Sequence, residues 1–306
     1  VISYKQAMLE FGSDKPDLRN PLRIVDVTDF FQRCTFKPFH GQTVRAIKVS
    51  NKMSKGFHEK LLKFATSIGM CGLGYLEVKE DLSYKGPIDK FIPDDMKAEI
   101  REIASLKAGD TIFFIADKEK QAALYAGQLR NELGQRLDLL EKNAYRFCFI
   151  NDFPMYEYDE EQKKIIFTHN PFSMPQGGLE ALTTKDPLEL LAYQYDIVCN
   201  GVELSSGAVR NHNLDIMVKA FEIAGYTEED LKEKFGALYN AFQYGAPPHA
   251  GMAPGVDRMI MLLRNEENIR EVIPFPMNGN AQDVMCGAPN EVSEMQLREV
   301  HIKVRK

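Results

Sequence analysis

Apolar positions in the first 126 residues follow two alternating patterns, one typical of strands and one typical of helices. Short runs rich in β-branched and apolar residues predict strands over 45–49, 73–78 and 111–115. Apolar positions three or four residues apart predict helices over 55–68, 93–104 and 118–133. The alternation predicts a compact α+β module over 21–126, preceded by a segment over 1–20 that ends in a polar, turn-rich stretch over 12–20.

The remaining residues, 127–306, show a different pattern. Strands are expected over 146–150 and 164–168, and a helix is expected to begin at Pro187 with Asp186 as its N-cap. A later helix, capped by Thr227, carries four apolar side chains on one face: Leu231, Phe235, Leu238 and Phe242. This part of the chain is predicted to form an antiparallel sheet with flanking helices.

The dipeptide Asn200-Gly201, between two strand-like runs, is a strong short-range signal of a β-hairpin. A two-residue turn there pairs Val198 with Glu203. Because side chains alternate between the two faces of a strand, Asp196, Val198 and Glu203 then share one face. The two carboxylates are diagonal neighbours and can reach one ion between them. Mg²⁺ is such an ion, since it takes oxygen ligands and usually one or two carboxylates.

Arg210 falls on the opposite face of the hairpin by strict alternation. A bulge at Ser206-Gly207 would return it to the carboxylate face, and glycine is common in bulges. The alternative interpretation of the hairpin is a solvated strand with ordinary surface charges.

A second segment, 249–263, reads as a strand of small residues that runs into an apolar helix. Gly251, Ala253 and Gly255 fall on one face and leave a flat floor for a planar base. Arg258 lies in the first turn of the helix, where its guanidinium can bind a phosphate through two hydrogen bonds. The alternative is that the glycines allow close packing and the arginine is a surface charge.

Composition narrows the classes of protein further. The chain has 306 residues, 44 acidic and 38 basic side chains and a net charge of −6, which argues against non-specific coating of nucleic acid but leaves RNA open as a substrate. Five scattered cysteines without a Cys-x-x-Cys pair argue against zinc and disulfide frameworks and favour a reducing, intracellular compartment. No membrane span and no secretory signal are expected, and the first residue, Val1, suggests a start inside a longer protein.

The run from Gly251 to Leu263 resembles motif 3 of the class II aminoacyl-tRNA synthetases. Four further segments are similar to bacterial-type aspartyl-tRNA synthetases: 12–19, 169–172, 195–210 and 235–251. The resemblance covers essentially the whole chain and implies an α+β fold, with part of the class II antiparallel sheet, its flanking helices and an inserted α+β module. It implies three parts: a remnant of the catalytic domain after motif 2 (1–20), a GAD-type insertion domain (21–126) and the C-terminal part of the catalytic domain (127–306).

The resemblance also implies a reaction. ATP and L-aspartate would form aspartyl-adenylate with Mg²⁺, and the aspartyl group would pass to tRNA(Asp), with tRNA(Asn) open as a second substrate. The parent enzyme is expected to be a cytoplasmic homodimer. The anticodon-binding barrel, motif 1 and motif 2 of the family are not recognised in this chain, so it is expected to be a C-terminal portion that is inactive alone.

Site residues follow from the resemblance, position by position. Asp196 and Glu203 match carboxylates that act through Mg²⁺, and Glu203 also contacts ATP. Arg210 matches the arginine that binds the aspartate side chain, and His169 matches a histidine that lies against bound aspartate. The remaining expected ATP contacts belong to motif 3: Gly255, Val256, Asp257 and the phosphate-binding Arg258.

Three positions depart from the usual family pattern, namely Asn170, Pro254 and Met277. Four charged residues near the N-terminus either line the entrance for the tRNA acceptor end or form a solvated turn: Asp14, Lys15, Asp17 and Arg19. Two other functions stay open, an ammonia-dependent asparagine synthetase paralogue and a non-catalytic interaction module derived from a synthetase.

Overall fold

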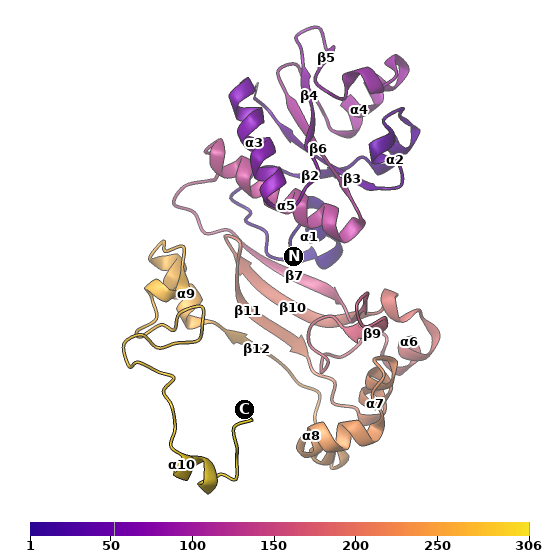
Figure 1. The fold of residues 1–306 in the computed structure, drawn as a ribbon. Coiled ribbons are helices and arrows are strands. Elements are labelled where there is room, and N and C mark those ends of the chain that lie inside the picture. Colours follow the sequence, from indigo (N-terminus) through magenta and orange to yellow (C-terminus); the bar gives the residue numbers. More distant parts are fainter. Residues whose placement is uncertain (52, 306) are drawn as a thin grey trace. The chain divides into compact units, whose positions relative to one another are not determined.

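The computed structural model describes residues 1–51 and 53–305 of the chain (Figure 1). These residues form two compact units, one from Val1 to Pro254 and a second that begins at Gly255. The fold of the first unit is α+β and contains two five-stranded sheets and a two-stranded one. The predicted fold class, α+β with antiparallel sheets and flanking helices, is confirmed.

One sheet belongs to the predicted module. Its strand order is β2-β3-β6-β4-β5, every pairing is antiparallel, and β6 lies at the centre. Its strands are β2 (Ile24–Asp26), β3 (Thr43–Val49), β4 (Gly74–Val78), β5 (Tyr84–Lys85) and β6 (Thr111–Asp117). Its helices are α2 (Thr28–Arg33), α3 (Lys55–Ser67), α4 (Lys97–Ile103) and α5 (Glu119–Arg136).

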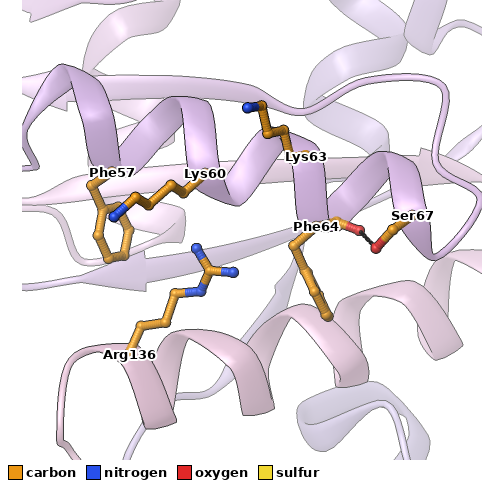
Figure 2. A pocket seen from close by; sticks show the side chains of 6 residues that line it. All are labelled: Phe57, Lys60, Lys63, Phe64, Ser67 and Arg136. Carbon is orange, nitrogen blue, oxygen red and sulfur yellow. Dashed lines mark hydrogen bonds between the residues drawn. The ribbon is translucent and has the colours of Figure 1, made fainter.

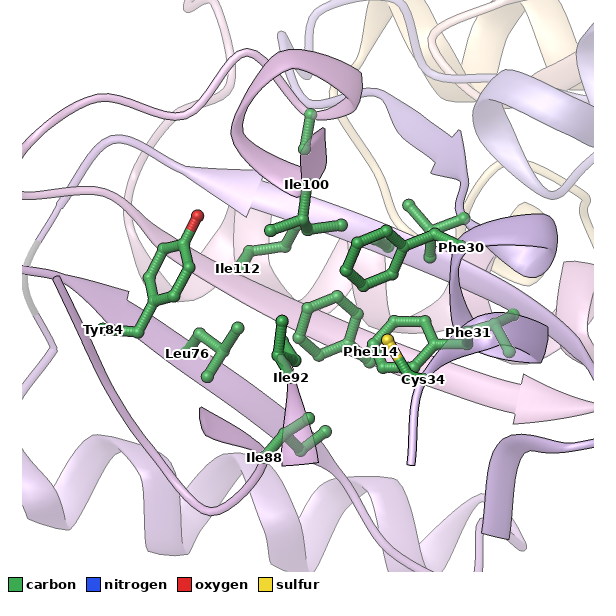
Figure 3. Close-up of a cluster of buried hydrophobic side chains, with 14 of the residues drawn as sticks. Phe30, Phe31, Cys34, Leu76, Tyr84, Ile88, Ile92, Ile100, Ile112 and Phe114 are labelled. Atoms are coloured by element: carbon green, nitrogen blue, oxygen red, sulfur yellow. The ribbon is translucent and has the colours of Figure 1, made fainter. Parts of the chain in front are cut away.

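Both faces of this sheet are covered, which explains why the central strand β6 contains a continuous apolar run over 112–116. On one face, Phe114 of β6 packs with Phe30 and Phe31 of α2 and with Ile100 of α4 (Figure 3). On the other face, residues of β3 and β6 pack against α3 and α5, including the fully buried Leu61. The module therefore has a core on each side of the sheet.

The other five-stranded sheet carries the hairpin. Its order is β1-β7-β10-β11-β12, with β1 parallel to β7 and the other pairings antiparallel. Its strands are β1 (Ile2–Ser3), β7 (Phe147–Pro154), β10 (Leu191–Cys199), β11 (Val202–Val209) and β12 (Ala250–Pro254). Beside it lies the pair β8 (Tyr156–Asp159) and β9 (Lys164–Phe167), with the helices α1 (Tyr4–Phe11), α6 (Gly178–Thr184), α7 (Leu214–Ile223) and α8 (Glu228–Gln243).

Most predicted elements are confirmed within a few residues, but one is wrong. The helix expected at Pro187 is a single 3-10 turn, Pro187–Glu189, after which β10 begins at Leu191. Asp186 does cap this turn by accepting a hydrogen bond from the backbone N–H of Leu188 at 2.9 Å. The start signal was therefore real, but strand pairing with β7 takes over after one turn.

The polar, turn-rich stretch predicted over 12–20 is confirmed as bends and turns, and a helix that the sequence pattern did not predict precedes it. Residues 4–11 form α1, which is capped by the Ser3 hydroxyl and ends at Gly12 in the left-handed conformation. The predicted module boundary at residue 126 falls inside α5, which continues to Arg136.

The second unit contains the helix α9 (Val256–Leu263), the 3-10 turn Ile269–Glu271 and the short helix α10 (Glu294–Glu299). The apolar helix predicted after the strand of small residues is confirmed as α9, and the strand itself is confirmed as β12 of the first unit. Across both units, no described helix is long and apolar enough to cross a membrane.

Candidate functional site

The turn between β10 and β11 is the two-residue turn expected from the sequence. Asn200 has φ 52° and Gly201 has φ 84°, the positive values that such a hairpin turn requires. The Asn200 side chain fixes the turn to the preceding segment, since its Oδ1 accepts from the Arg146 backbone N–H and its Nδ2 donates to the Ala144 carbonyl, both at 2.9 Å. Val198 pairs with Glu203 as predicted.

The hairpin contains a bulge, but at a different place from the predicted one. The register shifts by one residue between Val198, which pairs with Glu203, and Ile197, which pairs with Ser205. Leu204 is therefore the extra residue, and the predicted bulge at Ser206-Gly207 is wrong. Its expected consequence holds, because Asp196 now pairs with Ser206 and the same alternation carries Arg210 onto the face of Asp196.

Gly207 has another function than the one expected. A Cβ at this position would lie 2.5 Å from the Gly251 carbonyl oxygen and 2.5 Å from the ring of Tyr195. The absence of a side chain at residue 207 therefore lets β12 and the tyrosine approach β11 closely.

Asp196 is a buried carboxylate, with only 4% of its surface exposed. Its Oδ1 atom has no hydrogen-bond partner among the described residues. Burial raises the pKa of Asp196 above its usual value, and the nearby charge of Glu203 raises it further, against the opposing effects of Ser206 and Lys15. A buried acceptor without a partner is costly and fits a cation that binds there.

Lys15 reaches this carboxylate pair from the N-terminal segment. Its Nζ lies 3.5 Å from Oε2 of Glu203 and 2.8 Å from Oδ2 of Asp14. Burial alone would lower the pKa of Lys15, but the hydrogen bond and charge of Asp14, together with Glu203, raise it above the usual value. Lys15 is therefore a protonated cation at neutral pH, placed beside the two carboxylates.

The donor set of this site fits Mg²⁺. Within the described ranges 1–51 and 53–305, no cluster of three or more metal-ligating side chains occurs. Asp196 and Glu203 provide two carboxylates on one face, and Mg²⁺ usually binds one or two carboxylates while keeping waters or phosphate oxygens. These two residues would therefore hold the ion, and a nucleotide or water would complete its coordination.

Arg210 lies just beyond β11, where two segments meet. It forms an isolated antiparallel bridge with Ser173, and its backbone N–H donates to the His249 carbonyl at 2.9 Å. Its guanidinium carbon lies 5.6 Å from the centre of the Phe172 ring. The backbone of Arg210 is thus fixed by hydrogen bonds on both sides, while the side chain rests on an aromatic ring.

His169 lies in the loop that leads into this bridge. Its ring meets the ring of Phe153 edge-on at 5.0 Å and lies 6.3 Å from that of Tyr4. Asn170, the next residue, uses its side-chain oxygen to accept from the backbone N–H of Phe172 at 2.9 Å. The amide at position 170 therefore stabilises a local turn, which explains how this departure from the family pattern fits the fold.

The predicted floor of small residues is partly confirmed in the first unit. Ala253 pairs with Ser206, so Gly251 and Ala253 share the face of β12 that continues the carboxylate face of the hairpin. A Cβ built on Gly251 would meet no atom within 4 Å, which means that the space above it is open.

The remaining predicted residues belong to the second unit. Gly255 is the N-cap of α9, and the first turn of that helix holds Val256, Asp257 and Arg258. The expected first-turn position of Arg258 is confirmed, whereas its convergence with Asp196 and Glu203 stays a prediction. The Met277 carbonyl accepts a hydrogen bond from Nε of Arg270 at 3.0 Å.

Sequence reasoning missed two buried polar residues near the site and gave Lys15 no defined place. Lys15 was treated as part of an entrance or a solvated turn, although its charge between Asp14 and Glu203 gives it a defined place. Ser173 and Asn211 are 0% and 1% exposed, and their side-chain polar atoms have no hydrogen-bond partner among the described residues. Ser173 is the bridge partner of Arg210, and the backbone N–H of Asn211 donates to the Phe172 carbonyl at 2.8 Å, a pairing of distant segments that no local pattern reveals.

Comparison with known proteins decides the family. The model of the family described as tRNA synthetases class II (D, K and N) matches residues 1–279 of the 306.

The chain belongs to this family.

Several curated proteins are similar to this chain. An "Aspartate--tRNA(Asp/Asn) ligase" of Ehrlichia chaffeensis is 51% identical, over 100% of this chain and 53% of the relative. One of the same description from Zymomonas mobilis is 54% identical, over 99% and 52%. An "Aspartate--tRNA ligase" of Streptomyces avermitilis is 53% identical, over 100% and 52%. The chain thus spans about half the length of the curated relatives it matches.

Proposed function

We propose that this chain is part of an aspartate–tRNA ligase and that it supplies the Mg²⁺ carboxylates and the aspartate-binding arginine of the active site. The observation that carries the proposal is the bulged hairpin, which brings Asp196, Glu203 and Arg210 to one face of the sheet. The names of the relatives, at 51–54% identity over the whole chain, support the choice of aspartate as the amino acid.

The reaction has two steps in this proposal. The α-carboxylate of L-aspartate attacks the α-phosphorus of ATP and releases pyrophosphate, giving aspartyl-adenylate. A hydroxyl of the terminal ribose of tRNA(Asp) then attacks the aspartyl carbonyl and releases AMP. Mg²⁺, when bound by Asp196 and Glu203, would offset negative charge on the phosphates during the first step.

The residues of this chain bind and orient the substrates. Arg210 pairs with the side-chain carboxylate of aspartate through two parallel hydrogen bonds, which an amide cannot match. His169 lies beside the amino acid, and Gly251 leaves room for the adenine. From motif 3, Arg258 binds the terminal phosphate of ATP, with Gly255, Val256 and Asp257 beside it. Lys15 completes the charge balance of the phosphate site.

Further properties belong to the whole protein. We place it in the cytoplasm as a homodimer, with tRNA(Asn) as a second substrate that two relatives' names include. Because the chain covers only about half of its relatives, we expect it to be inactive alone. An assay of aspartate-dependent ATP–pyrophosphate exchange should give no signal above background, and clear exchange by the purified chain would contradict this.

Binding tests the proposal without requiring turnover. A non-hydrolysable mimic of aspartyl-adenylate should bind the chain at least about tenfold more tightly than the asparaginyl mimic, measured by calorimetry. Arg210→Met should abolish the preference, whereas Arg146→Met, which removes an exposed arginine paired with Glu141 at 2.6 Å, should keep it. Equal affinity of the wild-type chain for both mimics would contradict the proposed specificity.

A further inference from the structure

The module of the first sheet has a hollow on its surface between α3 and α5. Its volume is about 680 Å³. Figure 2 shows the side chains that line it. Six residues line it: Phe57, Lys60, Lys63, Phe64, Ser67 and Arg136. None of them was given a function by the sequence pattern or by the site on the hairpin.

The hollow is basic. Lys60 from α3 and Arg136 from α5 project toward the same space from opposite sides (Figure 2). Neither Lys60 nor Lys63 has an ion pair with any residue in the described part of the chain. Arg136 is paired with Glu132, whose Oε1 accepts from Nε at 2.6 Å. Three cations beside one carboxylate leave net positive charge, which favours an anionic ligand.

Two aromatic rings form the apolar part of the hollow. Phe57 and Phe64 are half-buried and pack against the core between α3, α5 and the sheet. The guanidinium carbon of Arg136 lies 6.0 Å from the centre of the Phe64 ring. Fixed rings beside cations form the combination that binds a phosphate together with a stacked base.

A second hollow on the same module shows the opposite charge. It has a volume of about 500 Å³, and its lining holds four acidic and two basic side chains: Glu77, Glu80, Asp81, Asp110, Lys79 and Lys85. The acidic residues would repel a polyanion, so the two hollows of the module differ in the charge of the ligand they favour. This contrast provides an internal control for the hollow between α3 and α5.

We propose that the hollow between α3 and α5 binds the phosphate backbone of an RNA, with a base against Phe57 or Phe64. The inference rests on the proposed function, which supplies tRNA as the RNA. RNA is favoured over an acidic protein segment because the half-buried rings offer a stacking surface that carboxylates do not use. The hollow would be a contact additional to the site where the acceptor end reacts.

The test measures binding of the 306-residue chain to a fluorescent transcript of tRNA(Asp) by anisotropy across a range of salt concentrations. Lys60→Glu with Lys63→Glu should weaken binding at least about tenfold. It should also reduce the slope of log affinity against log salt by about 1 to 2, because two phosphate contacts are lost. Phe57→Leu should weaken binding at unchanged slope, since a stacking contact carries no charge.

A matched control keeps the result specific. The double variant Lys79→Glu with Lys107→Glu makes the same change of charge elsewhere on the module, at two lysines that are also exposed. It should leave RNA affinity within about twofold of that of the wild-type chain. Equal loss in both double variants would mean diffuse attraction and would overturn the proposal. Undetectable RNA binding by the wild-type chain would also overturn the proposal. The same holds if the Lys60/Lys63 double variant loses binding to poly-glutamate but keeps binding to RNA.

This test is independent of the test of the catalytic site. If Arg210→Met abolishes the aspartyl preference while RNA affinity is insensitive to Lys60 and Lys63, only the inference about the hollow fails. If the mimics bind with equal affinity while the hollow binds RNA, the proposed specificity fails instead.

Discussion

The buried position of Asp196 makes its ionised carboxylate unfavourable in the native state, which lowers the free energy of unfolding. Its pKa is raised chiefly by burial, so the native state holds a proton at pH values where the unfolded chain has lost it. The free energy of unfolding therefore falls as the pH rises through the interval between the unfolded and the native pKa. Above that interval the full cost is present, which is typical of a residue retained for binding rather than for stability.

Replacing this charge should stabilise the protein. In metal-free buffer at pH 7, we expect Asp196→Asn to raise the Tm by about 2–4 °C, equivalent to roughly 1 kcal/mol for a protein of this size. The gain should disappear at pH values below the ordinary range of an aspartate. Differential scanning calorimetry at several pH values measures both effects.

Asp159 provides the opposite case on the same unit. Its carboxylate accepts from the backbone N–H of Gln162 at 2.9 Å, which is the largest cause that lowers its pKa. Asp159→Asn should therefore lower the Tm at pH 7. If Asp196→Asn lowers it as well, burial of the Asp196 charge is not the dominant effect.

At the scale of elements, two glycines of the sheet have different surroundings. Gly207 lies where β11, β12 and the ring of Tyr195 approach closely, whereas the space above Gly251 is open. One glycine therefore serves packing of the sheet, and the other keeps a surface clear.

Alanine at these two positions should separate stability from binding. Gly207→Ala forces a Cβ to within 2.5 Å of a backbone oxygen, so we expect a loss of about 2–4 kcal/mol in the free energy of unfolding, measured in urea. Gly251→Ala should leave this free energy within about 0.5 kcal/mol but weaken binding of the aspartyl-adenylate mimic. Equal stability of the two variants would contradict the packing around residue 207.

The sequence predicted the elements whose signals are local. The turn at Asn200-Gly201 and the helix capped by Thr227 depend on residues within a few positions, and both are confirmed. The helix α7 was missed although Asn213 is a clear N-cap, whose side chain accepts from the backbone N–H groups of Asp215 and Ile216. That signal was present in the sequence and was not used.

Features that depend on distant segments could not be predicted in the same way. The bulge at Leu204 lies in β11, which pairs with β10 on one side and β12 on the other, so its place belongs to the register between strands. The ion pair of Lys15 with Glu203 joins residues that are remote in the sequence. Neither relation has a local pattern that would reveal it.

At the scale of the whole molecule, α5 of the module is joined to the segment that carries Lys15. Arg130 is 1% exposed and donates hydrogen bonds to the carbonyls of Leu22 at 2.8 Å, Asp17 at 3.0 Å and Asn20 at 2.8 Å. Burial lowers the pKa of Arg130 to about 10, which still leaves it charged at neutral pH. The module therefore supports the loop that reaches the carboxylate site.

Loss of this arginine should loosen the loop. Arg130→Met removes three hydrogen bonds to carbonyls of this loop, each worth about 1 kcal/mol, so we expect a loss of about 3 kcal/mol in the free energy of unfolding and faster amide hydrogen exchange over residues 13–22. Gln128→Met, at an exposed position two residues earlier in α5, is the matched control. If exchange over 13–22 stays unchanged in Arg130→Met, the loop is held by other contacts.

The central claim is that Asp196 and Glu203 hold one divalent cation on the face of the sheet. Titration of the metal-free chain with Mn²⁺, followed by electron paramagnetic resonance, tests it directly. The account predicts one site per chain whose affinity falls at least about tenfold in Asp196→Asn and in Glu203→Gln, remains in Asp159→Asn, and rises a few-fold in Lys15→Met because a competing cation is removed. Binding that is the same in all these variants, or no binding by the wild-type chain at millimolar Mn²⁺, would contradict it.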